Sequence, residues 1–268
     1  MSSIYPIPPL PPLTAEEQAD PFAGFYYEPI GDPDPDILDA LRPDNPMPPQ
    51  WSIGFEDIEQ LFRPEGLDHP CGFCLRPDGT GYMSMRVDMG SVTPEMRAFF
   101  YTRFLDAKPL YYRIWLPGFH IDHRKPFTES FGWGQGRVCF RREIIPMNSP
   151  PDYRALGLSA PMEELDPHFL SVACSSAEFV PLDPADGGFY NVMLGVYKKN
   201  DRGGVVGNCV SWFGVDIVDG KPVRMLPEGE TMDLEKVRLY TCHQAYEMTR
   251  LRDILPAIFA QAKGSEKE

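Results

Sequence analysis

The sequence lacks the features that would send a chain into or across a membrane. None of its apolar runs approaches the roughly 20 residues of a transmembrane helix. The first residues, MSSIYPIPPLPPLTAEEQ, lack the charged and apolar regions of a signal peptide. Six cysteines among 268 residues are too sparse for a disulfide scaffold, so reduced thiols are expected. We therefore predict a cytoplasmic protein with no membrane partner, stabilised by an apolar core.

Basic residues are also scarce. The chain has 25 Lys and Arg against 39 Asp and Glu, a net charge of −14 and a pI near 4.8. A nucleic-acid-binding protein with this charge would need a compensating basic patch. The sequence offers only two short basic clusters, at 140–143 and 197–202. Nucleic acid and anionic membrane surfaces are accordingly excluded as expected partners.

Several common catalytic motifs are missing as well. There is no G-x-S-x-G nucleophile elbow, no P-loop and no G-x-G-x-x-G fingerprint. The glycine-rich stretch GWGQG at 132–136 lacks the lysine of a P-loop and is interpreted as a turn or bulge. These absences argue against a serine hydrolase of the elbow type and against a nucleotide-dependent enzyme.

Proline, in contrast, is abundant, with 30 residues, many of them before position 50. The stretch YPIPPLPPL favours a polyproline II conformation and cannot join the interior of a sheet. We interpret residues 1–50 as an extended arm and 51–268 as the main domain. The aromatic FAGFYYEPI at 22–30 favours packing of the arm on its own domain or on a partner subunit over a disordered tail. A homodimer is the expected assembly.

The main domain shows the patterns of an α+β protein. A short amphipathic helix is predicted at 55–62, and a helix capped by Thr93 follows at 94–105. A long helix is predicted at 233–262. Strands are predicted within 72–89 (two, joined at Asp78-Gly79), 110–120, 131–145, 168–182, 189–200 and 207–218. We expect a mostly antiparallel, curved sheet around the long C-terminal helix, with a ligand cavity between them.

The stretch TCHQAYEM in the last helix places His243 and Glu247 four residues apart, on one helix face. Imidazole and carboxylate together suit zinc or another divalent transition metal, although such pairs also occur on exposed helix surfaces. Further ligands are available after the aromatic run at 110–120, where His120 and His123 stand three residues apart. These histidines are equally compatible with an exposed loop. The single C-x-x-C in HPCGFC at 69–74 is a weaker, competing metal motif.

Three separated segments resemble, in the correct order, the family of 2,4-diacetylphloroglucinol hydrolase and phloretin hydrolase. They are DGTGYMSMRVDMGSVTPEMRAFFYTRF (78–104), LYYRIWLPGFH (110–120) and CHQAYEMTRLRDILP (242–256), about a fifth of the chain. The resemblance implies a helix-grip, START-like catalytic domain with an N-terminal dimerising portion. It also implies a zinc ion held by two histidines and two glutamates, and hydrolysis of the carbon–carbon bond between an acyl group and a phenolic ring.

By position in this resemblance, His120, His243 and Glu247 match three zinc ligands. The remaining glutamate is expected on a strand after His120; Glu143 is the first candidate and Glu129 the reserve. Tyr112 matches a tyrosine that contacts the phenol oxygen of the substrate.

Two positions depart from the family pattern. His123 stands where the family has asparagine. In the strand at 189–200, Tyr197 and two lysines stand where the family has a pocket histidine.

The resulting hypothesis is a retro-Claisen hydrolase for a small aromatic, polyketide-like substrate, either a phloroglucinol-like ketone or a 1,3-diketone. Tyr112 and His123 are the expected hydrogen-bond donor and proton shuttle. Aromatic residues are expected to line the pocket or to be ordinary core: Tyr111, Trp115, Phe119 and Trp133. Two alternatives remain: a metal-dependent cyclase, isomerase or decarboxylase that releases no acid, and a helix-grip protein that binds a ligand without chemistry.

Overall fold

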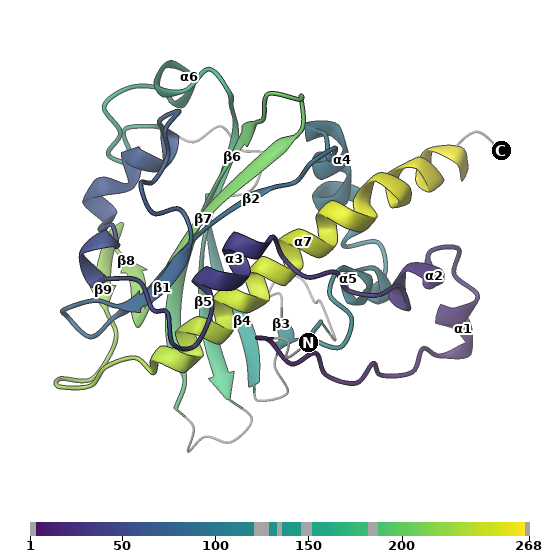
Figure 1. The fold of residues 1–268 in the computed structure, drawn as a ribbon, viewed down its shortest axis with the longest axis horizontal. Coiled ribbons are helices and arrows are strands. Elements are labelled where there is room, and N and C mark those ends of the chain that lie inside the picture. Colours follow the sequence, from purple (N-terminus) through teal and green to yellow (C-terminus); the bar gives the residue numbers. More distant parts are fainter. Residues whose placement is uncertain (1–3, 121–128, 133–135, 146–151, 182–186, 266–268) are drawn as a thin grey trace.

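The structure is a computed structural model. It describes residues 4–120, 129–132, 136–145, 152–181 and 187–265, with side chains described throughout except at 129–132 and 136–143. Figure 1 shows a central sheet crossed on one face by the long C-terminal helix, with the N-terminal segment running beside that helix.

The sheet has seven strands, and every neighbouring pair is antiparallel. In spatial order the strands are β1 (Gly72–Leu75), β2 (Gly81–Asp88), β7 (Val205–Phe213), β6 (Phe189–Lys199), β5 (Phe169–Pro181), β4 (Gly136–Ile145) and β3 (Glu129–Gly132). A separate hairpin is formed by β8 (Val215–Val218) and β9 (Lys221–Arg224). Its turn residues Asp219 and Gly220 both have positive φ, which suits a tight two-residue connection.

The helices precede, interrupt and follow the strands. They are α1 (Ala15–Gln18), α2 (Ala23–Tyr26), α3 (Pro35–Ala40), the 3₁₀ helices η1 (Pro49–Trp51) and η2 (Phe55–Phe62), α4 (Pro94–Phe99), the π-helical turn η3 (Phe100–Phe104), α5 (Pro109–Trp115), α6 (Met162–Leu165) and α7 (Leu234–Ser265). Among the described residues, none of these helices combines the length and apolar character needed to cross a bilayer.

Both faces of the sheet are covered. Alternate residues of β2, such as Met83 and Met85, belong to the core shared with α7, while Tyr82 belongs to a second core on the opposite face. Phe62 of η2 and Met162 of α6 contribute to that second core. Because the central strands are buried on both sides, β7 has no exposed residue along its length. The predicted α+β class, with an antiparallel sheet and a C-terminal helix, is therefore confirmed.

Three local predictions from the sequence hold in detail. The helix α4 begins where Thr93 caps it: the Thr93 hydroxyl accepts a hydrogen bond from the Met96 N–H at 3.2 Å, and Pro94 occupies the first turn. The long helix predicted at 233–262 is α7, which continues through Pro256 to Ser265. The two strands predicted within 72–89 are β1 and β2.

The strand predicted at 110–120 is wrong, because the chain forms the helix α5 there. Lys108 is extended and Pro109 supplies the fixed φ of a first helical position, so the helix starts immediately after the proline. Leu110, Tyr111 and Ile114 are then buried on one helical face. The aromatic run favoured a strand by propensity, but packing against the core decides the conformation. Two further differences are smaller: the 131–145 strand is a hairpin of β3 and β4, and 55–62 is a 3₁₀ helix.

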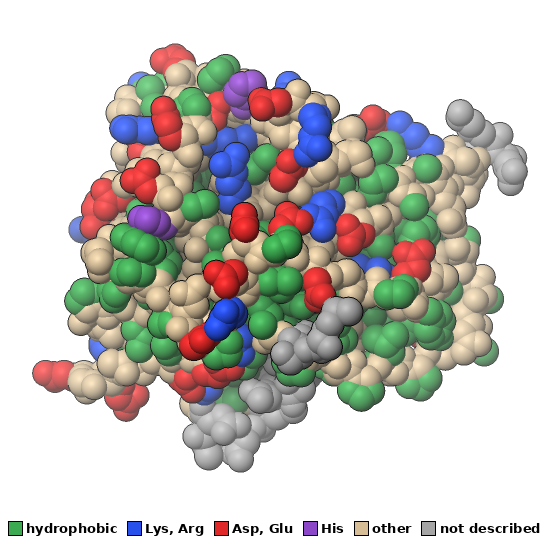
Figure 2. Space-filling model, in the orientation of Figure 1, with side chains coloured by type: hydrophobic (Ala, Val, Ile, Leu, Met, Phe, Trp, Pro, Cys, Tyr) green, Lys and Arg blue, Asp and Glu red, His purple; other side chains and the backbone are tan. Residues whose placement is uncertain are grey.

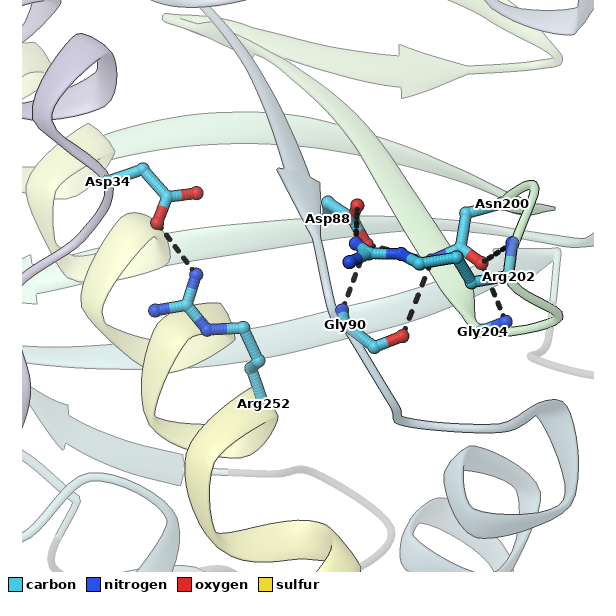
Figure 3. Close-up of polar contacts among 7 residues, drawn as sticks. All are labelled: Asp34, Asp88, Gly90, Asn200, Arg202, Gly204 and Arg252. Carbon is cyan, nitrogen blue, oxygen red and sulfur yellow. Dashed lines mark hydrogen bonds and ion pairs between the residues drawn. The ribbon is translucent and has the colours of Figure 1, made fainter.

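The proline-rich segment 4–50 contains three short helices joined by extended chain, and it packs against α5 and α7. Arg113 of α5 pairs with Glu17 at 2.8 Å, and Arg252 of α7 pairs with Asp34 at 2.9 Å (Figure 3). Tyr26 is fully buried. The segment is thus attached along its length to the rest of the same chain.

The charged surface is mixed. On the face seen in Figure 2, Lys and Arg side chains are interspersed with acidic ones. At one end of β2, Asp88 accepts hydrogen bonds from Asn200 and pairs with Arg202, each at 2.8 Å (Figure 3). Asn200 also accepts from the Gly204 N–H, so the turn between β6 and β7 is fixed to β2.

Candidate metal centre

The pair predicted from TCHQAYEM faces inward from α7. His243 and Glu247 lie one helical turn apart and are 8% and 7% exposed. His243 Nε2 is 3.4 Å from Glu247 Oε1. The pair is therefore buried between α7 and its neighbours, and the alternative of an exposed surface pair is excluded.

His120 approaches the same carboxylate from the segment after α5. Gly118, with φ +85°, reverses the chain there, and the His120 N–H donates to the Leu116 carbonyl at 2.9 Å. His120 is 2% exposed, and its Nε2 lies 2.8 Å from Glu247 Oε1. One ligand atom from each of the three residues lies within 4.8 Å of the others. The structure thus brings together three of the four predicted metal ligands.

The ring of His120 is oriented by α5. Its Nδ1 lies 3.2 Å from the Tyr112 carbonyl oxygen, which can only accept, so Nδ1 carries the hydrogen. The Tyr112 ring stacks on the imidazole at 4.1 Å with an interplanar angle of 4°. Burial lowers the pKa of His120, so the ring is neutral and Nε2 presents a lone pair.

That lone pair faces a negative charge. His120 Nε2 is buried and has no hydrogen-bond partner in the described chain, although the Glu247 carboxylate is close. Burial alone would raise the pKa of Glu247, but His243 and His120 hold it at about 2, so the carboxylate is ionised. At 2.8 Å a bare lone pair and a carboxylate repel each other, so the contact requires either a shared proton or a metal cation between the two groups.

The surrounding residues hold the carboxylate in place. Gln244 Nε2 donates to Glu247 Oε2 at 2.7 Å, which leaves Oε1 directed at the histidines. Trp115 Nε1 donates to the backbone carbonyl of Glu247 at 3.1 Å and joins α5 to α7. The role of Gln244 was missed at the sequence level, although its i, i+3 spacing to Glu247 is a signal for this contact.

The donor set fits zinc. Two imidazole nitrogens and a carboxylate oxygen are ordinary zinc ligands, and two ligands of a tetrahedral zinc ion lie roughly 3.3 Å apart. The 3.4 Å between His243 Nε2 and Glu247 Oε1 agrees with this spacing. The Tyr112 carbonyl, which accepts the Nδ1 hydrogen of His120, provides the outer hydrogen bond that is usual for a metal-binding histidine.

The other predicted site residues are only partly placed. Glu143 lies in β4 opposite Ser175 and Glu129 lies in β3 opposite Cys139, but both side chains are outside the described part of the chain. His123 falls in 121–128 and also lies outside the described residues.

Only some of the aromatic residues predicted to line the pocket lie next to the histidines. Trp115 and Phe119 contact the site histidines, with ring centroids 5.1 Å from His120 and 5.6 Å from His243. Tyr111 instead stacks on Phe104 at 4.2 Å. Trp133 lies outside the described residues.

The competing C-x-x-C motif forms no metal site in the described chain. Cys71 packs toward the core under α7 and Cys74 belongs to the core on the opposite face of the sheet. Burial raises the pKa of Cys71 to about 12 and that of Cys74 to about 11, so both thiols are protonated. Neither cysteine joins a cluster of potential ligands among the described residues.

Two comparisons with known proteins found similarity to this chain. A family model described as the DAPG hydrolase PhiG domain matches residues 53–145, a range that contains α5, His120 and Glu143. Phloretin hydrolase from Eubacterium ramulus is 24% identical over 264 residues, which covers 89% of each chain. Both matches are hydrolases. The chain is thus similar to DAPG and phloretin hydrolases.

Proposed function

We propose that the protein is a zinc-dependent hydrolase that cleaves the carbon–carbon bond between an acyl group and a phenolic, phloroglucinol-like ring, or the equivalent bond of a 1,3-diketone. The observation that carries the proposal is the buried cluster of His120, His243 and Glu247, in which a neutral imidazole lone pair faces an ionised carboxylate. The family match supplies the class of substrate.

The proposed ligands are His120, His243, Glu247 and Glu143, with Glu129 in reserve for the fourth position. A bound zinc ion would polarise the acyl carbonyl and lower the pKa of a bound water toward about 7. The protein's own contribution is to orient the His120 imidazole, to hold the carboxylate through Gln244 and to exclude bulk water from the ligands.

The reaction adds water across the acyl–ring bond in a retro-Claisen cleavage. The water oxygen bonds to the acyl carbon, the carbon–carbon bond breaks, and its electron pair passes to the ring carbon as a delocalised enolate. His123 accepts the proton of the water and returns one to the ring carbon, giving a carboxylic acid and a phenol. The Tyr112 hydroxyl donates to the phenol oxygen on which the charge develops.

The proposal is tested with the purified protein in two measurements. We expect one zinc per chain by elemental analysis, and release of a carboxylic acid from phloretin or an acylphloroglucinol. With ¹⁸O water, the label should enter the acid. His243→Ala should remove both the zinc and the activity, whereas His168→Ala, which changes an exposed histidine, should leave both unchanged. Wild-type protein without stoichiometric zinc would contradict the proposal.

One observation favours a second candidate, a metal-dependent cyclase, isomerase or decarboxylase. Where the family has a pocket histidine, the buried Tyr197 lies beneath the Arg97 guanidinium at 3.3 Å. A changed pocket group could accompany a changed reaction on a polyketide-like substrate. Turnover of the substrate by the zinc-loaded protein, without release of a carboxylic acid, would favour this candidate. Ligand binding without zinc or turnover would instead favour a binding protein.

Three further parts of the proposal concern the protein as a whole. A helix-grip, START-like class is supported by α7 crossing one face of the antiparallel sheet (Figure 1). A homodimer is supported by exposed apolar side chains on the N-terminal segment: Ile7 and Leu10 at 40% and Tyr27 at 55%. Light scattering should give twice the chain mass, and a monomer would contradict it. A cytoplasmic location stays a prediction.

A further inference from the structure

The stretch YPIPPLPPL crosses the loop that carries His120. A Cβ atom at Gly118 would lie 2.9 Å from the Pro8 carbonyl oxygen, so the two backbones are in close contact. Arg238 of α7 donates to the Ile4 carbonyl at 3.0 Å and to the Leu41 carbonyl at 3.3 Å. The start of the segment is thereby held against α7, one to two helical turns before His243.

Tyr5 is placed inside the molecule by these contacts. It is 2% exposed, and its ring stacks on Phe119 with centroids 4.6 Å apart and an interplanar angle of 8°. Its hydroxyl oxygen lies 3.0 Å from His243 Nδ1. Tyr5 therefore contacts both His243 and Phe119, the residue that precedes His120.

The contact with His243 has a chemical consequence. The Nε2 atom of His243 faces Glu247, so binding of a metal by Nε2 requires the hydrogen to be on Nδ1. The Tyr5 hydroxyl oxygen is positioned to accept that hydrogen. The Tyr112 carbonyl accepts the corresponding hydrogen of His120. Such outer acceptors fix the tautomer and ring orientation of metal-binding histidines.

We propose that Tyr5 is a positioning residue of the metal centre, which holds His243 in the tautomer and orientation that binds metal. The inference rests on the proposed function, because it assumes that His243 is a ligand. It makes the proline-rich segment a part of the centre: the prolines carry the chain over the Gly118 turn, and the tyrosine at its start completes the surroundings of the second histidine.

The test compares two tyrosines of the same segment. Tyr5→Phe removes only the hydroxyl on His243 and keeps the ring that stacks on Phe119. Tyr26→Phe is the matched control, because Tyr26 is also buried and its hydroxyl donates to the Pro11 carbonyl at 2.7 Å, away from the histidines. Zinc affinity is measured by competition with a chromophoric chelator. We expect Tyr5→Phe to lose roughly 10- to 100-fold in affinity and Tyr26→Phe to lose less than threefold.

A second readout concerns the hydrogen itself and does not depend on activity. In the zinc-loaded wild type, proton NMR should show a slowly exchanging imidazole N–H for His243, and Tyr5→Phe should shift it and accelerate its exchange with solvent. The N–H of His120 should be unchanged in the same spectrum, which shows that the variant is folded around the metal.

The outcomes separate this proposal from the proposed function. If the wild type binds zinc and releases acid but Tyr5→Phe keeps full zinc affinity, Tyr5 has no positioning role and the proposed function stands. If both variants lose affinity equally, the effect comes from general attachment of the segment, and the proposal is overturned. If the wild type binds no zinc, the proposed function fails and this proposal fails with it.

Discussion

Replacing Gln244 by alanine tests how much the hydrogen bond to Oε2 of Glu247 contributes to metal affinity. In the structure, Gln244 Nε2 donates to Glu247 Oε2 at 2.7 Å, while Oε1 faces both histidines. Without the amide, the carboxylate can rotate, and Oε2 must find another donor. We therefore expect Gln244→Ala to weaken metal binding without removing a ligand.

The size of the effect follows from the kind of hydrogen bond. A bond to a charged group contributes about 1.5–3 kcal/mol. Gln244 is half-buried, so water can partly replace its amide, and the lower end of the range applies. Because about 1.4 kcal/mol corresponds to a tenfold change in a binding constant, the zinc affinity should fall about tenfold.

The assay is chelator competition for zinc, with Gln261→Ala as the control. Gln261 lies on the same helix and also donates a 2.7 Å hydrogen bond, to the Pro21 carbonyl, but far along α7 from the centre. Its loss should leave zinc affinity unchanged. Equal affinities for wild type and Gln244→Ala would refute the reasoning, because the carboxylate would then need no outer donor.

Four other outcomes are expected. Trp115→Phe should lower the free energy of unfolding by about 1 kcal/mol in urea titrations, because it removes the donor to the Glu247 carbonyl; an unchanged midpoint would contradict this. Gly118→Ala should cost at least about 1–2 kcal/mol by the same measurement, since φ is +85° and the new Cβ meets Pro8. Tyr112→Phe should lower kcat at full zinc content, because its carbonyl still orients His120; zinc loss would argue against a substrate role. In metal-free protein, the pKa of Glu247 of about 2 lies below its ordinary 4.5, so the stability it contributes above pH 4.5 is lost as pH falls toward 2; Glu247→Gln should remove this part of the pH dependence of urea unfolding.

Helical periodicity made the α7 half of the centre predictable. Residues four apart share a helix face whatever the rest of the fold does, so His243 and Glu247 could be paired from the sequence. The order of the motifs then added His120. The sequence did not decide between Glu129 and Glu143 as the fourth ligand. The two residues lie in the two strands of one hairpin, β3 and β4, and the sequence does not determine the register of that hairpin.

Two of the errors come from packing and from contacts between distant segments. Aromatic and β-branched residues at 110–120 favour a strand by local preference, but Pro109 starts a helix and burial of Leu110 and Ile114 stabilises it. The contact of Tyr5 with His243 spans 238 residues and leaves no local pattern. Gln244 had a local signal that was overlooked, since its spacing to Glu247 is that of neighbours on one helix face.

The bond between Tyr5 and His243 joins two residues that are 238 positions apart in the chain. Closing a loop of this length costs conformational entropy that only a nearly complete fold can offset. The N-terminal stretch must therefore wait, during synthesis, for α7 to emerge and dock. We expect metal loading to follow docking of α7, so that a bound metal would stabilise the nearly completed fold and take no part in the early steps of folding.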